Sequence, residues 1–296
     1  MPKVSVLMPI WNTKEEHLRE AIESILNQTF KDFEYLILND SPDNTRLDEI
    51  VASYNDSRIQ YKRNENNMGI TPSRNKLLKM AEGDYIAIFD HDDVSEPTRL
   101  EKQVAYLDSH PEVGVVGSCA RTYPQKAACY IYPKNDDTIR ELMMDACSIL
   151  HPASMIRKSV LIEHSICYEE EYTPCEDYRL WLRLMEFTKF HNIQEALFNY
   201  RVHDTNTSRI MNERMSKVSY KLLDWAREKY SSDWRRYTQH STRKKTIRLF
   251  GIPIIHIYHR KNRTKISVLG ITVISIKEKI QDHPALVHLK SAPFPH

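Results

Sequence analysis

The stretch Tyr85-Ile86-Ala87-Ile88-Phe89-Asp90-His91-Asp92-Asp93 carries the clearest information about the fold of this chain. Its first five residues favour a short buried strand, and three carboxylates follow within four positions. Because neighbouring carboxylates repel one another, such a group becomes stable when a cation lies among them. If the strand geometry continues, Asp90 and Asp92 share one face and His91 lies on the other.

Two interpretations of this acidic strand end stay open from these residues alone. Carboxylate oxygens are preferred ligands of hard divalent cations, and Mg²⁺ keeps coordination positions for substrate phosphates. Aspartate is also common in solvated turns, where its side chain bonds to nearby backbone. The surrounding sequence has to decide between a metal site and a plain turn.

The sequence before this stretch alternates between short apolar runs and segments with helical spacing. The expected strands are Val4–Pro9, Phe33–Leu38, Ile59–Tyr61 and Tyr85–Phe89. The expected helices are 18–26, Leu47–Tyr54 and Ser73–Ala81, with Ser73 as the N-cap of the last one. This alternation predicts an α/β fold with a Rossmann-like, mostly parallel sheet flanked by helices. No Gly-x-Gly-x-x-Gly motif follows the first strand, so the sequence excludes the dinucleotide fingerprint.

A second group of elements follows the acidic stretch. The sequence predicts a helix at Arg99–Leu107, a strand at Val113–Gly117, a strand entry at 151–156 and an amphipathic helix at Cys175–Phe187. Glu176 and Asp177 lie in the first turn of that helix, where the helix dipole alone favours acidic residues. His151 has two interpretations, either packing and backbone hydrogen bonding or contact with an acceptor.

Polar residues follow several of the expected strands. Asn12 comes after the first strand, Asp40 after the second, and Asp90 and Asp92 after the fourth. Ligands of open α/β sheets bind beyond the carboxyl ends of the strands. Asp40 by itself fits a structural turn, but together with the acidic stretch it indicates a ligand site at this edge.

Composition limits the class of protein. The 296 residues are 41% hydrophobic, and the net charge of +2 excludes a chain-wide polyanion binder, so we expect no nucleic-acid partner. Five scattered cysteines without a Cys-x-x-Cys pair argue against a zinc site and a disulfide framework. No apolar run reaches 18 residues and the N-terminus has no signal-like core, so we expect a cytoplasmic protein, peripheral on the inner face of the membrane at most.

The C-terminal part has a different character. We expect a domain boundary after residue 208, with a basic appendage at 209–296 that contains a helix at Met211–Lys229. Two β-type segments, Leu249–Tyr258 and Val268–Lys277, align as an internal repeat. They predict a β-ribbon whose basic residues contact an anionic membrane; a homo-oligomer contact and a purely structural role are the alternatives.

Five segments in order resemble family 2 inverting glycosyltransferases, and the likeness covers roughly residues 3–205. They are Val4–Asn12, Leu18–Phe30, Asn67–Asn75, Gly83–Asp93 and Cys175–Leu184. The resemblance implies the GT-A fold, a nucleotide-diphosphate-sugar donor and Mn²⁺ or Mg²⁺. The ordered set of motifs is much more specific than any single one of them.

The resemblance also implies roles for individual residues. These are Asp177 as catalytic base with Glu176 beside it; Pro9, Asn12, Asp40, Arg74, Asp90 and His91 around the nucleotide sugar, with Asp40 on the nucleobase; and Asp92 and Asp90 on the metal. A Tyr-Arg-x-His pattern ends at His203, which either reaches the metal or diphosphate or is a solvated loop histidine.

The sequence therefore predicts a metal-dependent hexosyltransferase. It moves a hexose or N-acetylhexosamine, from a UDP-sugar, to a hydroxyl of a bacterial surface glycan such as lipopolysaccharide, and a lipid-linked glycan is one class of acceptor. A non-catalytic nucleotide- or glycan-binding protein is the main alternative. A sugar-nucleotide pyrophosphorylase needs a Gly-rich loop that Met8–Asn12 lacks, and an aspartate phosphatase needs its paired Asp after the first strand.

Overall fold

The computed structural model describes residues 1–124, 128–203 and 211–241, and the strand segments 243–249, 252–260, 263–268 and 271–277. Its main feature is a nine-stranded sheet, in which the strands follow the order β3-β2-β1-β4-β8-β6-β9-β5, and β7 pairs with β6. The strands are β1 (Val4–Ile10), β2 (Phe33–Asn39), β3 (Ile59–Arg63), β4 (Tyr85–Ile88), β5 (Val94–Ser95), β6 (Val113–Tyr123), β7 (Cys129–Tyr130), β8 (Met155–Arg157) and β9 (Lys189–Arg201).

The first four strands form the parallel half of this sheet. β1 pairs in parallel with both β2 and β4, and β2 pairs in parallel with β3. The chain therefore runs outward from β1 to β3 and then returns to the other side of β1, which makes a topological switch point between β1 and β4. Every residue of β1 and β2 is buried, as expected for central parallel strands covered on both faces. The predicted α/β fold and the four predicted strands are confirmed.

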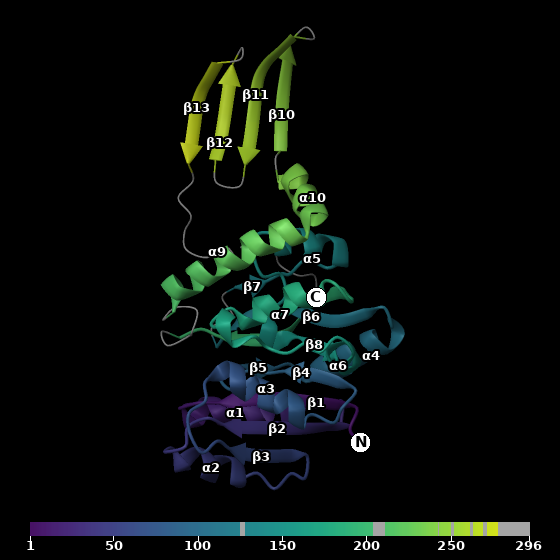
Figure 1. Ribbon diagram of the computed structural model, residues 1–296, viewed down its shortest axis with the longest axis vertical. Coiled ribbons are helices and arrows are strands. Elements are labelled where there is room, and N and C mark those ends of the chain that lie inside the picture. Colours follow the sequence, from purple (N-terminus) through teal and green to yellow (C-terminus); the bar gives the residue numbers. More distant parts are fainter. Residues whose placement is uncertain are drawn as a thin grey trace.

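Helices cover both faces of the sheet (Figure 1). They are α1 (Glu15–Leu26), α2 (Thr45–Ala52), α3 (Ile70–Met80), α4 (Arg99–Ser109), α5 (Asp136–Met143), α6 (Lys158–Glu163), α7 (Glu176–Leu184), α9 (Asn212–Lys229) and α10 (Ser231–Ser241). Alternate β1 residues take part in different cores. Val6 and Met8 belong to the core that includes residues of α1, α2 and α4, whereas Leu7 belongs to the core that includes residues of α3, α5, α7 and α9. No helix in the described part of the chain is long and apolar enough to span a membrane.

The start of α3 differs from the sequence prediction. Ser73 was expected to cap this helix, but the helix begins at Ile70 with Gly69 as its N-cap. Ser73 is fully buried inside the helix, and its hydroxyl accepts a hydrogen bond from Asn64. The prediction was wrong because Gly69 has φ +88°, a conformation that a glycine adopts without strain and that lets the chain turn into the helix earlier.

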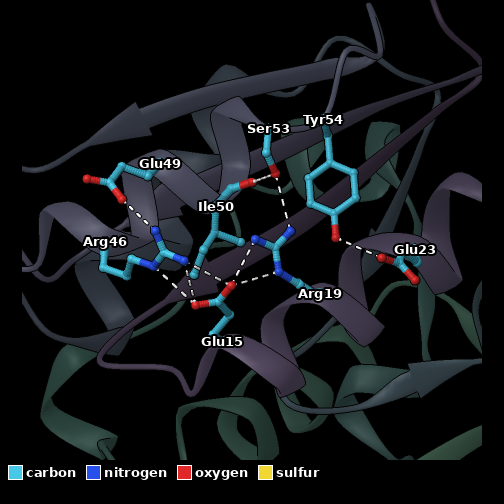
Figure 2. A network of polar contacts seen from close by, with 8 residues as sticks. All are labelled: Glu15, Arg19, Glu23, Arg46, Glu49, Ile50, Ser53 and Tyr54. Carbon is cyan, nitrogen blue, oxygen red and sulfur yellow. Dashed lines mark hydrogen bonds and ion pairs between the residues drawn. The ribbon is translucent and has the colours of Figure 1, made fainter.

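A polar network joins α1 to α2 on the outer surface of the molecule (Figure 2). Arg46 pairs with Glu15 of α1 and with Glu49 of its own helix, at 3.0 and 2.7 Å. Arg19 pairs with Glu15 at 2.9 Å. Pairs as exposed as these contribute little stability individually. Glu15 and Arg19 thus lie on the side of α1 that faces α2, and Glu20, on another side of the helix, contacts the end of β9.

The C-terminal repeat forms a separate four-stranded antiparallel sheet, β10 (Arg243–Leu249), β11 (Ile252–Arg260), β12 (Arg263–Val268) and β13 (Ile271–Lys277) (Figure 1). The sequence predicted two β segments, and the structure instead divides each copy of the repeat into two paired strands. Both pairs shift register at equivalent positions, after Ile247 and after Ile266. The boundary predicted after residue 208 falls among residues 204–210, outside the described residues.

Strand register brings many of the basic residues to one end of this small sheet. Lys244 and Lys265 both align with Tyr258, and Arg260 aligns with Arg263. β10 begins directly after α10, so this basic end adjoins the helical part of the chain.

Candidate active site

The predicted polar residues meet at the switch point of the sheet. Asn12 follows β1 in a left-handed conformation with φ 45°, and its backbone N–H donates to the Ser41 hydroxyl at 2.7 Å. Pro9 is buried within β1, beside β2. Asp40 follows β2 directly, and Asp90 follows β4 by two residues. The sheet thus brings three loops, which are far apart in sequence, to one edge.

Asp40 is almost fully buried and organises the loop before α3. Its carboxylate accepts hydrogen bonds from the Asn64 side chain and from the backbone N–H groups of Met68 and Gly69, at 2.7, 2.9 and 2.8 Å. Two of these donors lie at the N-terminus of α3, where the helix dipole favours a negative charge. Asp40 therefore shapes the loop that enters α3, and its predicted contact with a nucleobase stays a prediction.

Arg74 of α3 joins the two acidic motifs of the sequence. Its guanidinium pairs with Asp90 at 3.2 Å and with Glu176, the first residue of α7, at 2.6 Å. Burial alone would lower the pKa of this guanidinium, but the charges of Asp90 and Glu176 outweigh burial and raise the pKa of Arg74. The Nε of Arg74 and the Oε2 of Glu176 are buried and have no hydrogen-bond partner among the described residues. The site therefore keeps polar capacity for a ligand between α3 and α7.

Asp177, the second residue of α7, has a raised pKa. Burial, and next the charge of Glu176, raise its pKa to about 7, although Arg74 and the backbone N–H of Tyr178 act in the opposite direction. That N–H donates to Asp177 Oδ1 at 2.7 Å. A base is most effective when its pKa lies near the working pH. A carboxylate with a pKa near neutrality thus directly follows Glu176, the partner of Arg74.

Helix α9 holds α7, and thereby the acidic pair, in place. Arg179 of α7 lies 4.2 Å from the ring centroid of Trp225 on α9, and the Tyr230 hydroxyl donates to the Leu182 carbonyl at 2.6 Å. The thiol of Cys175, which directly precedes the acidic pair, lies 3.3 Å from the Ser219 hydroxyl. Sequence reasoning missed these contacts because they link segments more than forty residues apart.

Asp92 and His203 form a second group near the first. His203 Nε2 lies 2.7 Å from Asp92 Oδ2. Burial opposes the charged form of Asp92, yet the neighbouring His91 and the hydrogen bond from His203 lower its pKa. His91 itself turns to Thr13, with Nδ1 3.0 Å from the hydroxyl. His91 and Asp92 therefore have different partners, although β4 ends at Ile88 and the predicted strand geometry does not continue through these residues.

The residues predicted to hold a metal are only partly brought together. Asp92 and His203 are in contact, whereas Asp90 pairs with Arg74. Among the described residues, no three His, Cys, Asp or Glu side chains converge as a metal site. A carboxylate oxygen and an imidazole nitrogen are nevertheless ligands that Mn²⁺ accepts, and a diphosphate can supply further oxygens. The donor set therefore fits a metal that is held jointly by protein and donor.

Two buried titratable side chains, Asp93 and Arg99, lie close to the acidic turn. Asp93 is fully buried, and burial, followed by the charges of Asp92 and Asp90, raises its pKa well above the ordinary range. Arg99 is also fully buried, and burial lowers its pKa to about 9 against the opposing charges of Asp93 and Asp90. Asp93 accepts a hydrogen bond from the backbone N–H of Arg201 at 2.7 Å. The third carboxylate is thus an internal anchor, which the sequence could not distinguish from a ligand.

His151 lies in the protein interior. Its Nε2 is 2.8 Å from the Tyr168 hydroxyl, and its ring lies 5.7 Å from that of Trp181. Burial, and next the charge of Arg74, lower the pKa of His151 well below its ordinary value. Of the two interpretations left open by the sequence, the structure supports packing. The Arg74 guanidinium also lies over the Tyr168 ring, 5.7 Å from its centroid, and no sequence motif predicted this contact.

Several known proteins are similar to this chain. The family model described as glycosyl transferase family 2 matches residues 5–164. An uncharacterised glycosyltransferase of Methanocaldococcus jannaschii is 32% identical over 247 residues, which cover 77% of this chain and 81% of that protein. The putative glycosyltransferase EpsE of Bacillus subtilis is 37% identical over 206 residues, or 68% and 73% of the two chains.

Solved structures agree on the fold. TarS 1–349 of S. aureus in complex with UDP-GlcNAc aligns with a TM-score of 0.61 at 20% identity, over 76% of this chain and 66% of that one. The mannosyltransferase PcManGT of Pyrobaculum calidifontis, in complex with GDP-Man and Mn²⁺, aligns with a TM-score of 0.56 at 19% identity, over 72% and 61%. The match thus spans less than two thirds of the length of each solved chain. At these identities the likeness concerns the fold, which is the GT-A fold expected from the sequence.

Proposed function

Since this chain belongs to glycosyltransferase family 2, we propose that it is a metal-dependent inverting enzyme that transfers a hexose or N-acetylhexosamine from a UDP-sugar to a hydroxyl of a surface glycan. The observation that carries the proposal is the Arg74 bridge, which links Asp90 at the donor edge to Glu176 beside Asp177. The Arg74 guanidinium thus connects the acidic stretch that would bind the sugar donor with the helix that carries the base. Sugar transfer needs a bound donor and a base in the same site. A sugar-nucleotide pyrophosphorylase has no need of such a base.

Asp177 would remove the proton of the attacking hydroxyl. With a pKa of about 7, a large fraction of this carboxylate is ionised at neutral pH and still basic enough to accept a proton in the transition state. Glu176 is paired with Arg74 and nearly fully buried, so an incoming hydroxyl has less access to it. We therefore assign the base to Asp177 and a supporting role to Glu176.

Donor binding would involve the other side of the site. Asp40, Asn12 and Pro9 border the position proposed for the nucleoside, and Arg74, Asp90 and His91 lie toward the sugar diphosphate. Asp92, with Asp90 and His203, would hold Mn²⁺ or Mg²⁺, which when bound neutralises charge on the departing diphosphate. The complexes of TarS with UDP-GlcNAc and of the mannosyltransferase with GDP-Man and Mn²⁺ support a nucleotide sugar and a divalent cation.

The acceptor proposal involves the C-terminal sheet. Strand register groups basic residues at one end of β10, β11 and β12, next to α10. Each basic residue near an anionic bilayer adds about 1 kcal/mol of attraction. We propose that this end contacts a membrane and brings the active site to a lipid-linked glycan, and a homo-oligomer contact is the alternative.

A panel of nucleotide sugars tests the function. Thermal unfolding is followed with UDP- and GDP-sugars, in Mn²⁺ and in EDTA, because a ligand that binds the native state raises the apparent stability. We expect one UDP-sugar to raise Tm in Mn²⁺ and to be hydrolysed slowly without acceptor. A ligand that raises Tm but is never hydrolysed or transferred would instead indicate a binding protein. If no nucleotide sugar raises Tm, the proposed function is refuted.

A further inference from the structure

The end of β9 is held in place by contacts from three separate parts of the chain. The backbone N–H of Arg201, the last residue of β9, donates to the buried carboxylate of Asp93 at 2.7 Å. Arg201 also donates through its side chain, from Nε to the carbonyl oxygen of Asp92 at 2.5 Å. In both bonds Arg201 is the donor, once through its backbone and once through its side chain, and the acceptors are two consecutive residues of the acidic turn. They fix the acidic turn after β4 against the end of β9.

Helix α1 completes this arrangement. The guanidinium of Arg201 pairs with Glu20, whose carboxylate also accepts a hydrogen bond from the Tyr123 hydroxyl at 3.3 Å. The Arg201 guanidinium lies over the Tyr123 ring, 4.6 Å from its centroid. One turn earlier on α1, the ring of His17 lies 5.9 Å from that of His203. The side chain of Arg201 is only 8% exposed, so this geometry is enclosed by protein.

The three sides of α1 have different contacts. Leu18, Ala21, Ile22 and Ile25 are buried in the core, and Glu15, Arg19 and Glu23 face α2 (Figure 2). His17 and Glu20 are left for the end of β9. Because the core side and the α2 side fix the rotation of the helix, His17 and Glu20 are presented to β9 without freedom to turn away.

We infer that Arg201 is a positioning residue, clamped by Asp93 and Glu20, that sets His203 beside Asp92 before any ligand binds. His203 lies two residues beyond Arg201, so fixing Arg201 limits where the imidazole can lie. The inference rests on the proposed function for its consequence, since the Asp92–His203 pair belongs to the proposed metal–donor site. Partners one step removed from metal ligands commonly change metal affinity 10- to 100-fold when they are altered.

Two substitutions at the clamp test this inference. Glu20→Gln removes the charge of a side chain that is 44% exposed, so the fold should tolerate it. Arg201→Lys keeps the charge but cannot reach the Asp92 carbonyl and Glu20 together. Glu23→Gln is the matched control, because Glu23 lies on the same helix but bonds Tyr54 instead. Calorimetry measures UDP affinity in Mn²⁺ and in EDTA, and ¹⁵N-histidine NMR without ligand follows the ring signals of His203, assigned with His203→Gln.

We expect both clamp variants to raise the Kd of UDP about 5- to 50-fold in Mn²⁺ but not in EDTA, and to shift the His203 signals. Glu23→Gln should change neither. Wild-type affinity in Mn²⁺ together with unshifted His203 signals in both variants would overturn the inference, and so would equal weakening in Mn²⁺ and EDTA. If the wild type shows no metal-coupled UDP binding while the His203 signals still respond, the clamp stands and the proposed function fails.

Discussion

Replacing Asp177 with asparagine should stabilise the protein while it strongly reduces transfer. Partial burial of Asp177, together with the charge of Glu176 beside it, makes the charged carboxylate unfavourable in the folded state and raises its pKa from an ordinary 3.8 to about 7. Asparagine has nearly the same shape and can still accept the hydrogen bond from the Tyr178 N–H. The substitution therefore removes an unfavourable charge without opening a cavity and keeps the acceptor for the Tyr178 N–H.

The size and sign of the effect follow from the two pKa values. A rise from 3.8 to about 7 corresponds to a loss of about 4 kcal/mol of folding free energy when Asp177 is fully charged. Asp177 is partly exposed, so solvent screens part of this cost, and we expect Asp177→Asn to gain about 1–3 kcal/mol at pH 8. Below about pH 4 the carboxylate is protonated in both folded and unfolded chains, and the gain should vanish. It should grow between about pH 4 and 7 and stay constant above pH 7.

Urea unfolding of the wild type and Asp177→Asn at several pH values measures this difference. Asp224→Asn, on the exposed side of α9, is the control and should change stability by less than about 0.5 kcal/mol at any pH. Transfer by Asp177→Asn should fall by roughly 100-fold or more. A variant that is less stable than the wild type at pH 8, or a gain that does not depend on pH, would refute the proposed environment of Asp177. Near-normal turnover would place the base elsewhere, with Glu176 the first residue to test.

Three further predictions concern other parts of the molecule. Asp92→Asn should weaken UDP binding far more in Mn²⁺ than in EDTA, and equal calorimetric affinity of variant and wild type in Mn²⁺ would contradict the metal role. Gly69→Ala should cost about 1–3 kcal/mol in urea unfolding, because φ +88° strains any residue with a Cβ even though open space surrounds the position; unchanged stability would mean that the turn relaxes freely. Removal of residues 242–296 should reduce salt-sensitive binding to anionic liposomes while UDP affinity is kept. Equal sedimentation of the truncated and full chains with such vesicles would leave an oligomer contact or a structural role.

Much of the fold could be predicted because its signals are local. The apolar runs of β1 and β2 and the helical spacing after each of them specify strand–helix alternation, and the loops at the strand ends carry the polar residues. Local signals were weaker where tertiary contacts decide the boundaries. The predicted cap at Ser73 failed because the turn at Gly69, supported by the Asp40 carboxylate, starts α3 earlier.

The sequence by itself determined the family, the α/β fold and the acidic residues of the site, because ordered motifs and hydrophobic periodicity are properties of neighbouring residues. Only the tertiary structure decided which partner each of these acidic residues contacts. It paired Asp90 with Arg74 and Glu176, placed Asp92 against His203, and buried Asp93 as an anchor for Arg201. These distinctions depend on burial and on contacts between residues that are sixteen to more than a hundred positions apart in the sequence. Carboxylates that are neighbours in the sequence acquire different roles only when the fold brings a different partner to each of them.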